Sequence, residues 1–350
     1  MADQKPTLAD VARKSGVSRM SVSRALRDAP YVSAETRKKV LDAAAELGYR
    51  PDPQMAKLAS LMRGRKKGRT RQATLGIVRY SRPDDALSDP VYRFVSRELI
   101  EKRAGEHGYE VDEFFLNPKI MSPQRLRDVL LNRGIEGIVM SIQSSKPFST
   151  RFDFEPFASA VFGFGLTKPA LHRVTGNVAE GLSEAVGELR RRGYRRIGLA
   201  ITDWIDRRSY YTYSGTMLHC NEEHIEPENR VPPLVLANEN LPGSADRFCR
   251  WIREFSPDVV ISLDRYVPDW LEKRLGMKIP GDIGLLIHDW ESDMAGLAGI
   301  DHRRDQLAAA AVDLVANQLM RNQKGLPDPA WHVLIPPRFV EGESIRGGVK

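Results

Sequence analysis

Apolar residues in the first 50 positions recur at the spacing of short amphipathic helices. Three separate stripes follow the i, i+3, i+4 pattern that places side chains on one helical face. In chain order, they are Leu8, Val11 and Ala12; Val22 with Ala25 or Leu26; and Val40, Leu41, Ala44 and Leu47. The pattern therefore predicts three short helices.

Signals for helix starts and ends bound these three stripes. Thr7 and Asp10 have the spacing of a capping box, and Ser18 and Ser33 stand where the next two helices need an N-cap. Gly16 supplies the backbone freedom for a sharp turn between the first two helices, and Gly48 ends the third. Two short helices joined by a tight glycine turn predict a helix-turn-helix.

From Ala73 onward, apolar strands alternate with amphipathic helices. Such alternation predicts parallel sheets with helices on both faces, and about 275 residues favour two lobes over one core. The expected strands are Leu75–Arg79, Tyr109–Phe115, Gly137–Met140, Ser159–Phe162, Arg196–Ile201, Leu234–Leu236, Val259–Leu263, Ile283–His288 and Val333–Pro336. The expected helices are Val91–His107, Pro123–Asn132, Asn177–Arg192, Tyr211–Glu222, Gly243–Glu254, Trp270–Leu275 and Arg304–Arg321.

The balance of charge changes at the same point of the chain as the hydrophobic pattern, between the helical head and the strand-rich core. Residues 1–71 carry 17 Lys and Arg against 7 Asp and Glu, whereas the remainder carries 36 against 39. The basic head and the near-neutral body indicate that only the head binds a polyanion. A three-helix bundle without a ligand is therefore the less favoured interpretation. No apolar run of membrane length and no secretory signal is visible, and two cysteines fit a reducing compartment, so we expect a cytoplasmic protein without membrane contact.

The second helix of a helix-turn-helix enters the major groove and presents its N-terminal residues to the bases. Here Arg19, Met20 and Arg24 would meet base edges. Ser18, Ser21 and Ser23 would contact phosphates. These six residues are our first candidates for a DNA-binding surface.

Three runs in the head closely resemble the lactose-repressor (LacI/GalR) family of bacterial regulators. They are Thr7–Arg24, Val32–Arg37 and Leu47–Pro53. The resemblance implies a homodimer that reads a pseudo-palindromic, double-stranded DNA operator, with one recognition helix in each half-site. It also adds Thr7 and Tyr49 to the DNA contacts.

Residues 51–72 form the expected hinge between the head (1–50) and the core (73–350). In the family, a hinge helix pushes a leucine into the minor groove, which kinks the duplex. Leu58 stands at that position, but the hinge is longer than usual, so Leu61 competes for the role. Asp52 replaces the usual Asn, and the basic run Arg63–Arg71 adds phosphate contacts or serves only as a solvated linker.

The core resembles the family more loosely, and hence the two-lobed fold of periplasmic binding proteins. Asn132–Val139, Leu189–Gly198, Ile279–Gly284 and Leu334–Pro336 carry this resemblance. It implies three crossovers between lobes, which we expect near residues 165, 292 and 324. Ligands in such folds bind between the lobes, at the carboxyl ends of the strands.

Residues at those strand ends are the candidates for effector binding. Each is also explained by a cap or rim position, and the two interpretations stay open. The candidates are Tyr80, Trp204, Tyr210, Asp264, Asp289 and Trp290. Gly176 stands where the family usually has Asp, Leu263 where it has Asn, and Tyr210 where sugar-binding members place Arg, so the effector is held differently here.

The sequence thus predicts a DNA-binding transcriptional regulator, favoured as a repressor, whose operator affinity responds to a carbohydrate-related small molecule. The alternatives are a solute-binding protein or an enzyme on the same core, with a head that binds nucleic acid nonspecifically. No phosphate loop, dinucleotide fingerprint or nucleophile elbow is present, and His219, Cys220 and His224 lack the spacing of a metal site. We therefore expect no catalytic residues, metal or cofactor. The effector, the operator and the direction of regulation stay open.

Overall fold

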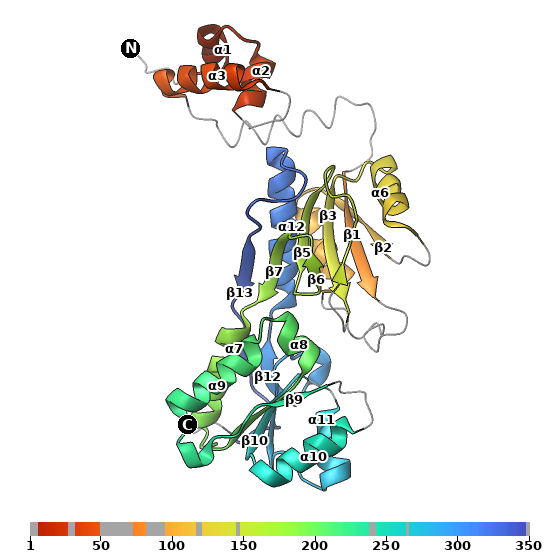
Figure 1. The fold of residues 1–350 in the computed structure, drawn as a ribbon, viewed down its shortest axis with the longest axis vertical. Coiled ribbons are helices and arrows are strands. Elements are labelled where there is room, and N and C mark those ends of the chain that lie inside the picture. The colour runs from red at the N-terminus through yellow and green to blue at the C-terminus, as the bar shows by residue number, and fades with distance from the viewer. Residues whose placement is uncertain are drawn as a thin grey trace.

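The computed structural model describes residues 6–26, 32–49, 73–81, 95–116, 121–144, 148–237, 243–263 and 266–347. They form a helical head and a core of two α/β lobes that follow one another along the long axis (Figure 1). Within these ranges, no helix combines the length and the apolar character needed to cross a membrane.

The head consists of the three predicted helices, α1 (Leu8–Ser15), α2 (Arg19–Ala25) and α3 (Ala34–Leu47). Small side chains fill its centre. They are Val11, Val22, Ala25, Val40, Ala43 and Ala44. Leu41, expected on the inner face of α3, is instead 48% exposed. Ala43 takes the inner place beside Val40 and Ala44.

The first lobe is built on a six-stranded parallel sheet with the order β13-β7-β5-β3-β1-β2. Its strands are β1 (Thr74–Ser81), β2 (Glu110–Phe115), β3 (Gly137–Gln143), β5 (Ala158–Phe162), β7 (His172–Gly176) and β13 (His332–Ile335). A two-stranded ribbon of β4 (Phe148–Ser149) and β6 (Leu166–Lys168) lies beside it. The central strands are apolar throughout because helices cover both faces.

Three helices cover the first lobe's sheet. Helices α5 (Arg97–Glu106) and α12 (Arg304–Arg321) share one buried cluster, and α6 (Pro123–Asn132) belongs to the cluster on the other face. Helix α12 packs closely against the sheet. A Cβ at Gly137 of β3 would lie only 2.7 Å from Val315 of α12. Gln318 of α12 also exchanges hydrogen bonds of 3.1 and 3.2 Å with the backbone of Ser159.

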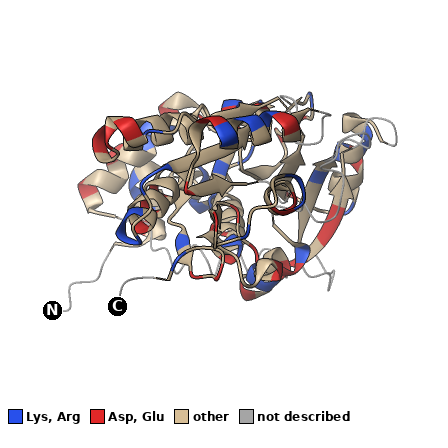
Figure 2. Cartoon of the chain, turned by 90° about the horizontal axis from the view of Figure 1, so that it is seen from below, with Lys and Arg blue, Asp and Glu red and all other residues tan. Residues whose placement is uncertain are grey.

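The second lobe repeats the plan with the strand order β14-β12-β11-β10-β8-β9, in which only β14 is antiparallel to its neighbour. Its strands are β8 (Ile197–Thr202), β9 (Leu234–Leu236), β10 (Val259–Ser262), β11 (Gly284–Ile287), β12 (Ala298–Asp301) and β14 (Arg338–Val340). Its helices are α7 (Val178–Arg191), α8 (Asp203–Arg208), α9 (Thr212–His224), α10 (Ser244–Phe255) and α11 (Val267–Asp269). Short turns complete it: η3 (Pro227–Asn229), η4 (Trp270–Arg274, π-helical) and η5 (Ser292–Met294). In the view of Figure 2, red and blue residues are interspersed over the molecule.

The chain passes between the lobes three times among the described residues. The passages lie at Asn177, between β7 and α7; at His302 and Arg303, between β12 and α12; and at Pro336 and Pro337, between β13 and β14. The expected positions near 165, 292 and 324 are each about ten residues too early. The short strands β7 and β12 cause the first two errors, because their mixed sequences, His-Arg-Val-Thr-Gly and Ala-Gly-Ile-Asp, give no apolar run to recognise.

Candidate nucleic-acid interface and ligand cavity

Side-chain caps fix the start of each helix of the head. The Thr7 hydroxyl donates to the Asp10 carboxylate at 2.6 Å and the Thr7 backbone N–H at 2.9 Å, which pairs the two residues of the predicted capping box and lowers the pKa of Asp10. Oγ of Ser18 accepts from the backbone N–H of Ser21 at 3.1 Å, and Oγ of Ser33 accepts from Thr36 at 3.2 Å. The caps orient α2 relative to its neighbours.

Helix α2 buries Val22 and Ala25 and turns its remaining residues outward. Met20 is 65% exposed, and Arg19 and Arg24 are exposed as well. This side of α2 is the one that the sequence assigned to base edges.

The other predicted DNA contacts of the head lie in two settings. Thr7 and Ser18 are exposed caps, and Ser18 Oγ lies 2.9 Å from Ser21 Oγ, so these hydroxyls already serve the helix start. Ser21 and Ser23 are half-buried. Tyr49 packs against the buried cluster of the head, which gives it a structural role beside any contact with DNA. Leu58, Leu61 and the basic run lie outside the described residues, and their roles stay predictions.

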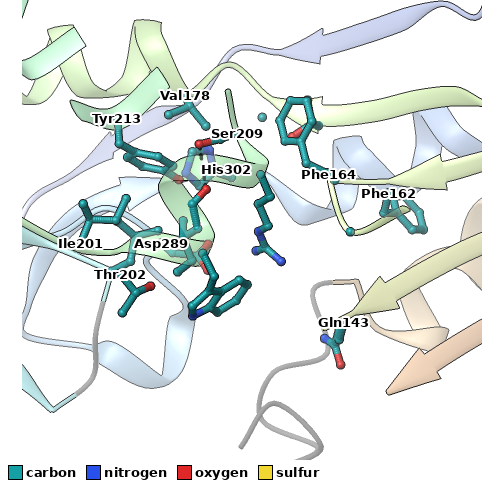
Figure 3. A pocket seen from close by; sticks show the side chains of 18 of the residues that line it. Gln143, Phe162, Phe164, Val178, Ile201, Thr202, Ser209, Tyr213, Asp289 and His302 are labelled. Atoms are coloured by element: carbon teal, nitrogen blue, oxygen red, sulfur yellow. Dashed lines mark hydrogen bonds between the residues drawn. The ribbon is translucent and has the colours of Figure 1, made fainter. Parts of the chain in front are cut away.

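A cavity of ≈ 170 Å³ lies between the two lobes (Figure 3). The ends of β3 and β7 and the loop after β5 form its wall in the first lobe. In the second lobe, the wall comes from β8, α8, the start of α9 and the loops after β10 and β11. The carboxyl ends of the strands of both sheets thus meet at the cavity, as the fold predicts. Its volume is comparable with the roughly 150 Å³ cavity that admits a benzene ring.

Two of the six predicted effector residues line this cavity, Trp204 and Asp289. Tyr80 is not among its lining residues and contacts Phe148, with ring centroids 3.9 Å apart. Trp290 packs into the second lobe and donates its indole N–H to the Leu297 carbonyl at 3.0 Å. Both residues follow β11, and their side chains diverge: Asp289 lines the cavity, whereas Trp290 packs into the second lobe.

The remaining predicted residues are Tyr210 and Asp264. Tyr210 is 73% exposed and meets the edge of Phe164 across the lobes, with ring centroids 5.8 Å apart. It therefore lies outside the cavity lining, beside Ser209, which does belong to it. Asp264 falls outside the described residues.

Among the described residues, four charged side chains line the cavity. Arg304 donates to Asp289 at 2.8 Å and to Glu291 at 3.1 Å, so one cation holds two carboxylates. The guanidinium of Arg208 lies 4.2 Å from the ring centroid of Trp204, within the range of a cation–π contact. Complete burial raises the pKa of Tyr213, and the neighbouring Asp289 raises it further, so this phenol is a neutral hydrogen-bonding group.

Sequence reasoning missed a pair of buried histidines beside the cavity, His288 and His302. Nε2 of His302 lies 2.8 Å from the His288 carbonyl oxygen. Burial lowers the pKa of both rings, so both are neutral at pH 7. The one available signal was Gly176, since a Cβ there would lie 2.3 Å from Nδ1 of His302. Within the described part of the chain, no group of three or more His, Cys, Asp or Glu could hold a metal ion.

Comparisons with known proteins support the family resemblance. The profile described as "Bacterial regulatory proteins, lacI family" matches residues 7–52, which include all three helices of the head. The transcriptional repressor CytR of Escherichia coli (strain K12) is 30% identical over 197 residues, or 55% of this chain and 52% of CytR. The matches span 35% to 52% of the length of the first curated relatives.

Two further comparisons cover nearly the whole chain. The transcriptional repressor PurR of Klebsiella pneumoniae (strain 342) is 23% identical over 98% of this chain and 97% of its own length. A crystal structure of the lac repressor dimer, bound to operator and an anti-inducer, aligns with a TM-score of 0.56 at 19% identity, over 98% of this chain and 100% of that one. The two-lobed core with parallel sheets thus has the fold of the lac repressor. The head is thus similar to the lacI family of bacterial regulatory proteins, and nearly the whole chain is similar to the repressor PurR.

Proposed function

We propose that this protein is a sequence-specific DNA-binding transcriptional regulator, a repressor, controlled by a small molecule. The observation that carries the proposal is the exposure of Arg19, Met20 and Arg24 on one side of α2, in a head that matches the family's DNA-binding part. Arginine can pair with guanine through two hydrogen bonds, and an exposed methionine can contact the methyl group of thymine.

The regulator acts as a homodimer on a pseudo-palindromic operator, with one α2 helix in each half-site. Phosphate contacts from the basic head and hinge supply the affinity that does not depend on sequence. CytR and PurR are named as repressors, and the lac repressor was solved as a dimer on its operator. These names support the direction and the assembly proposed here.

The small molecule binds in the cavity between the lobes, and we place it in the carbohydrate-related class. Both lobes line the cavity, and three chain passages connect them, so occupancy favours one arrangement of the lobes over another. The hinge transmits that arrangement to the paired heads. Operator affinity and effector affinity are then coupled reciprocally.

Selection of binding sites from random duplex DNA tests the function. The full-length protein should recover a two-fold symmetric motif. Arg19→Ala with Met20→Ala should change the bases selected within each half-site, whereas Arg253→Ala, an exposed arginine on α10, should leave the motif unchanged. Recovery of no motif by the intact protein would refute sequence-specific binding, and an unchanged motif in the double variant would confine α2 to backbone contacts.

A further inference from the structure

An aromatic contact joins the two lobes beside the cavity. Phe164, in the loop after β5, belongs to the first lobe and lines the cavity. Tyr210, between α8 and α9, belongs to the second lobe and follows the lining residue Ser209 (Figure 3). The two ring centroids lie 5.8 Å apart and the ring planes meet at 87°, an edge-to-face geometry that aromatic pairs prefer. This contact connects the lobes independently of the three chain passages.

The first lobe holds the ring of Phe164 in place. The guanidinium of Arg173, on β7, lies 5.3 Å from the ring centroid, within the range of a cation–π contact. Arg173 is only 6% exposed, and it donates to the carbonyl oxygens of Gly163 and Leu166, which flank Phe164 in the sequence. The ring of His332, on β13, approaches Phe164 with centroids 6.4 Å apart. Two strands of the first lobe thus position this ring.

The backbone of the same loop is packed tightly. A Cβ at Gly165 would collide with the carbonyl oxygen of Ile142, at the end of β3, so the loop approaches β3 as closely as glycine allows. Gly163 has a φ of 59°, in the left-handed region that favours glycine. The loop is therefore a firm support for Phe164.

The second lobe fixes the turn that carries Tyr210. The backbone N–H of Tyr210 donates to the Arg207 carbonyl at 3.1 Å, and that of Tyr211 donates to the Asp206 carbonyl at 2.7 Å. The Asp206 carboxylate accepts from the backbone N–H of Ser214 at 3.1 Å, which ties α8 to the start of α9. Both tyrosines have positive φ, 56° and 59°, so the chain turns sharply between the two helices. The backbone of Tyr210 is thus held at both of its ends.

The contact is of a kind that can open and close. Tyr210 is 73% exposed, so separation of the two rings returns little further apolar surface to water. Its two supports belong to different lobes, and relative movement of the lobes would part the rings. A weak contact between firm supports favours one arrangement of the lobes without locking it.

We propose that Phe164 and Tyr210 form a latch that favours the arrangement of the lobes in Figure 1 before any effector binds. Both are positioning residues, because they act on the lobes and not on DNA. The latch itself stands on the contact between the lobes, and only its effect on operator affinity rests on the proposed function. Its loss should shift the equilibrium between lobe arrangements by about 2- to 10-fold, the range expected for an edge-to-face aromatic pair.

The test measures the distance between the lobes in the full-length protein by pulsed electron paramagnetic resonance. Nitroxide labels are attached at Gln124→Cys on α6 and Glu254→Cys on α10, two exposed sites in different lobes. The native Cys220 and Cys249 are buried, so they react slowly with the label. Labelled chains exchange subunits with an excess of unlabelled chains before measurement, so that each distance joins the two labels of one chain.

Four variants separate the ring from the turn. Tyr210→Asn removes the ring and keeps the turn, because asparagine tolerates positive φ, and should reduce the population at the wild-type distance relative to other distances by about 2- to 10-fold. Tyr210→Phe keeps the ring and should restore the wild-type distribution. Tyr211→Asn makes the same change at the neighbouring exposed tyrosine, which has the same backbone conformation, and should alter nothing. Phe164→Leu combined with Tyr210→Asn should have no larger effect than either alone, because both remove one contact.

Two results would overturn the inference. One is a distance distribution in Tyr210→Asn that matches the wild type. The other is a shift in Tyr211→Asn as large as that in Tyr210→Asn, because the turn and not the ring would then set the lobes. Circular dichroism of each variant checks that it is folded.

Operator affinity of the same preparations is measured in parallel. A shift in the distances with unchanged operator affinity supports the latch and counts against the coupling between lobes and DNA in the proposed function. A protein that binds no duplex loses the proposed function, whereas the distances still decide whether the latch exists.

Discussion

The head and the core reach a fixed structure by different means. Six buried residues form the centre of the head, and none is larger than valine, so its burial of apolar surface is small. The clusters of the core contain Phe157, Phe248, Trp251 and many leucines. The head accordingly depends on its caps and turns, whereas the lobes depend on burial. Because the core of the head is small, the head can change its conformation on DNA at a small cost in free energy. The cavity lies between two lobes with large cores, which hold its shape.

The head and the core also differ in amino-acid composition, and this difference allows each region to be followed separately. All seven histidines and all five tryptophans lie in the core, and residues 1–72 contain neither. Tryptophan fluorescence therefore reports on the lobes alone, and DNA binding reports on the head. The two regions can be perturbed and followed separately in the intact protein.

Removal of residues 1–72 is expected to have the largest effect. The 73–350 fragment should lose duplex binding completely, because the basic, DNA-facing part of the chain is gone. It should keep the tryptophan fluorescence and the unfolding transition of the core. Binding is measured by titration of labelled duplex at one fixed salt concentration. Operator binding by the fragment would show that the division of roles is wrong.

Acid should destabilise the core and spare the head. His288 and His302 are neutral in the fold because burial lowers their pKa, and they regain an ordinary pKa near 6.5 on unfolding. The unfolded state therefore binds more protons below about pH 6.5, and stability falls by about 1.4 kcal/mol per pH unit for each ring that stays neutral. Above pH 6.5 this contribution is fully present.

Urea unfolding followed by tryptophan fluorescence, at a series of pH values, measures this slope. His288→Gln should reduce it by removing one of the two rings. His224→Gln, at an exposed site on α9, is the matched control and should leave it unchanged. A core as stable at pH 5 as at pH 7 would contradict the buried, neutral pair.

Val40→Ala should unfold the head selectively. Val40 is fully buried, and its truncation removes apolar contact and leaves a cavity, at a cost of about 2 kcal/mol. That cost is large for a head with so few buried residues, so operator affinity should fall while the core transition stays in place. Leu41→Ala is the neighbouring control, since Leu41 is 48% exposed. A larger loss from Leu41 than from Val40 would reverse the packing described for α3.

Ser33→Ala should have the smallest effect. It removes the oxygen that accepts from the Thr36 backbone N–H at the start of α3, and loss of such a cap costs about 1 kcal/mol. Far-ultraviolet circular dichroism of the intact protein should show an earlier loss of part of the helical signal, with unchanged tryptophan fluorescence. Ser33→Thr keeps an acceptor and should restore most of the stability. Equal stability of all three proteins would show that the caps matter less than the small core.

The sequence predicted best where local chemistry decides the structure. The caps Ser18 and Ser33 and the turn at Gly16 are local signals, and the head matches them closely. The bounds of α6 and α12 also agree with the expectation. The short strands β7, β12 and β14 were missed. Their three to five residues give no apolar run, and β7 and β14 each pair with a strand distant in sequence, β13 and β12 respectively.

The position of the cavity was predicted correctly, but only some of its lining residues were. The rule that ligands lie at strand ends located it, and Trp204 and Asp289 face it. Which of two consecutive residues turns inward depends on the exit of each loop, so Trp290 was assigned wrongly to the lining. His302 was missed because it stands in a passage between lobes that the sequence placed about ten residues too early.

The return of α12 to the first lobe also bears on how the chain is made. A ribosome releases residues 73–176 long before Arg304–Arg321, yet one face of their sheet is covered by Leu307, Ala311 and Val315 of that late helix. During synthesis, this apolar face stays open while the second lobe emerges, and it is closed only when α12 has been added. The first lobe to be started is therefore among the last to be finished, and an unfinished chain displays a surface that chaperones and aggregation partners recognise.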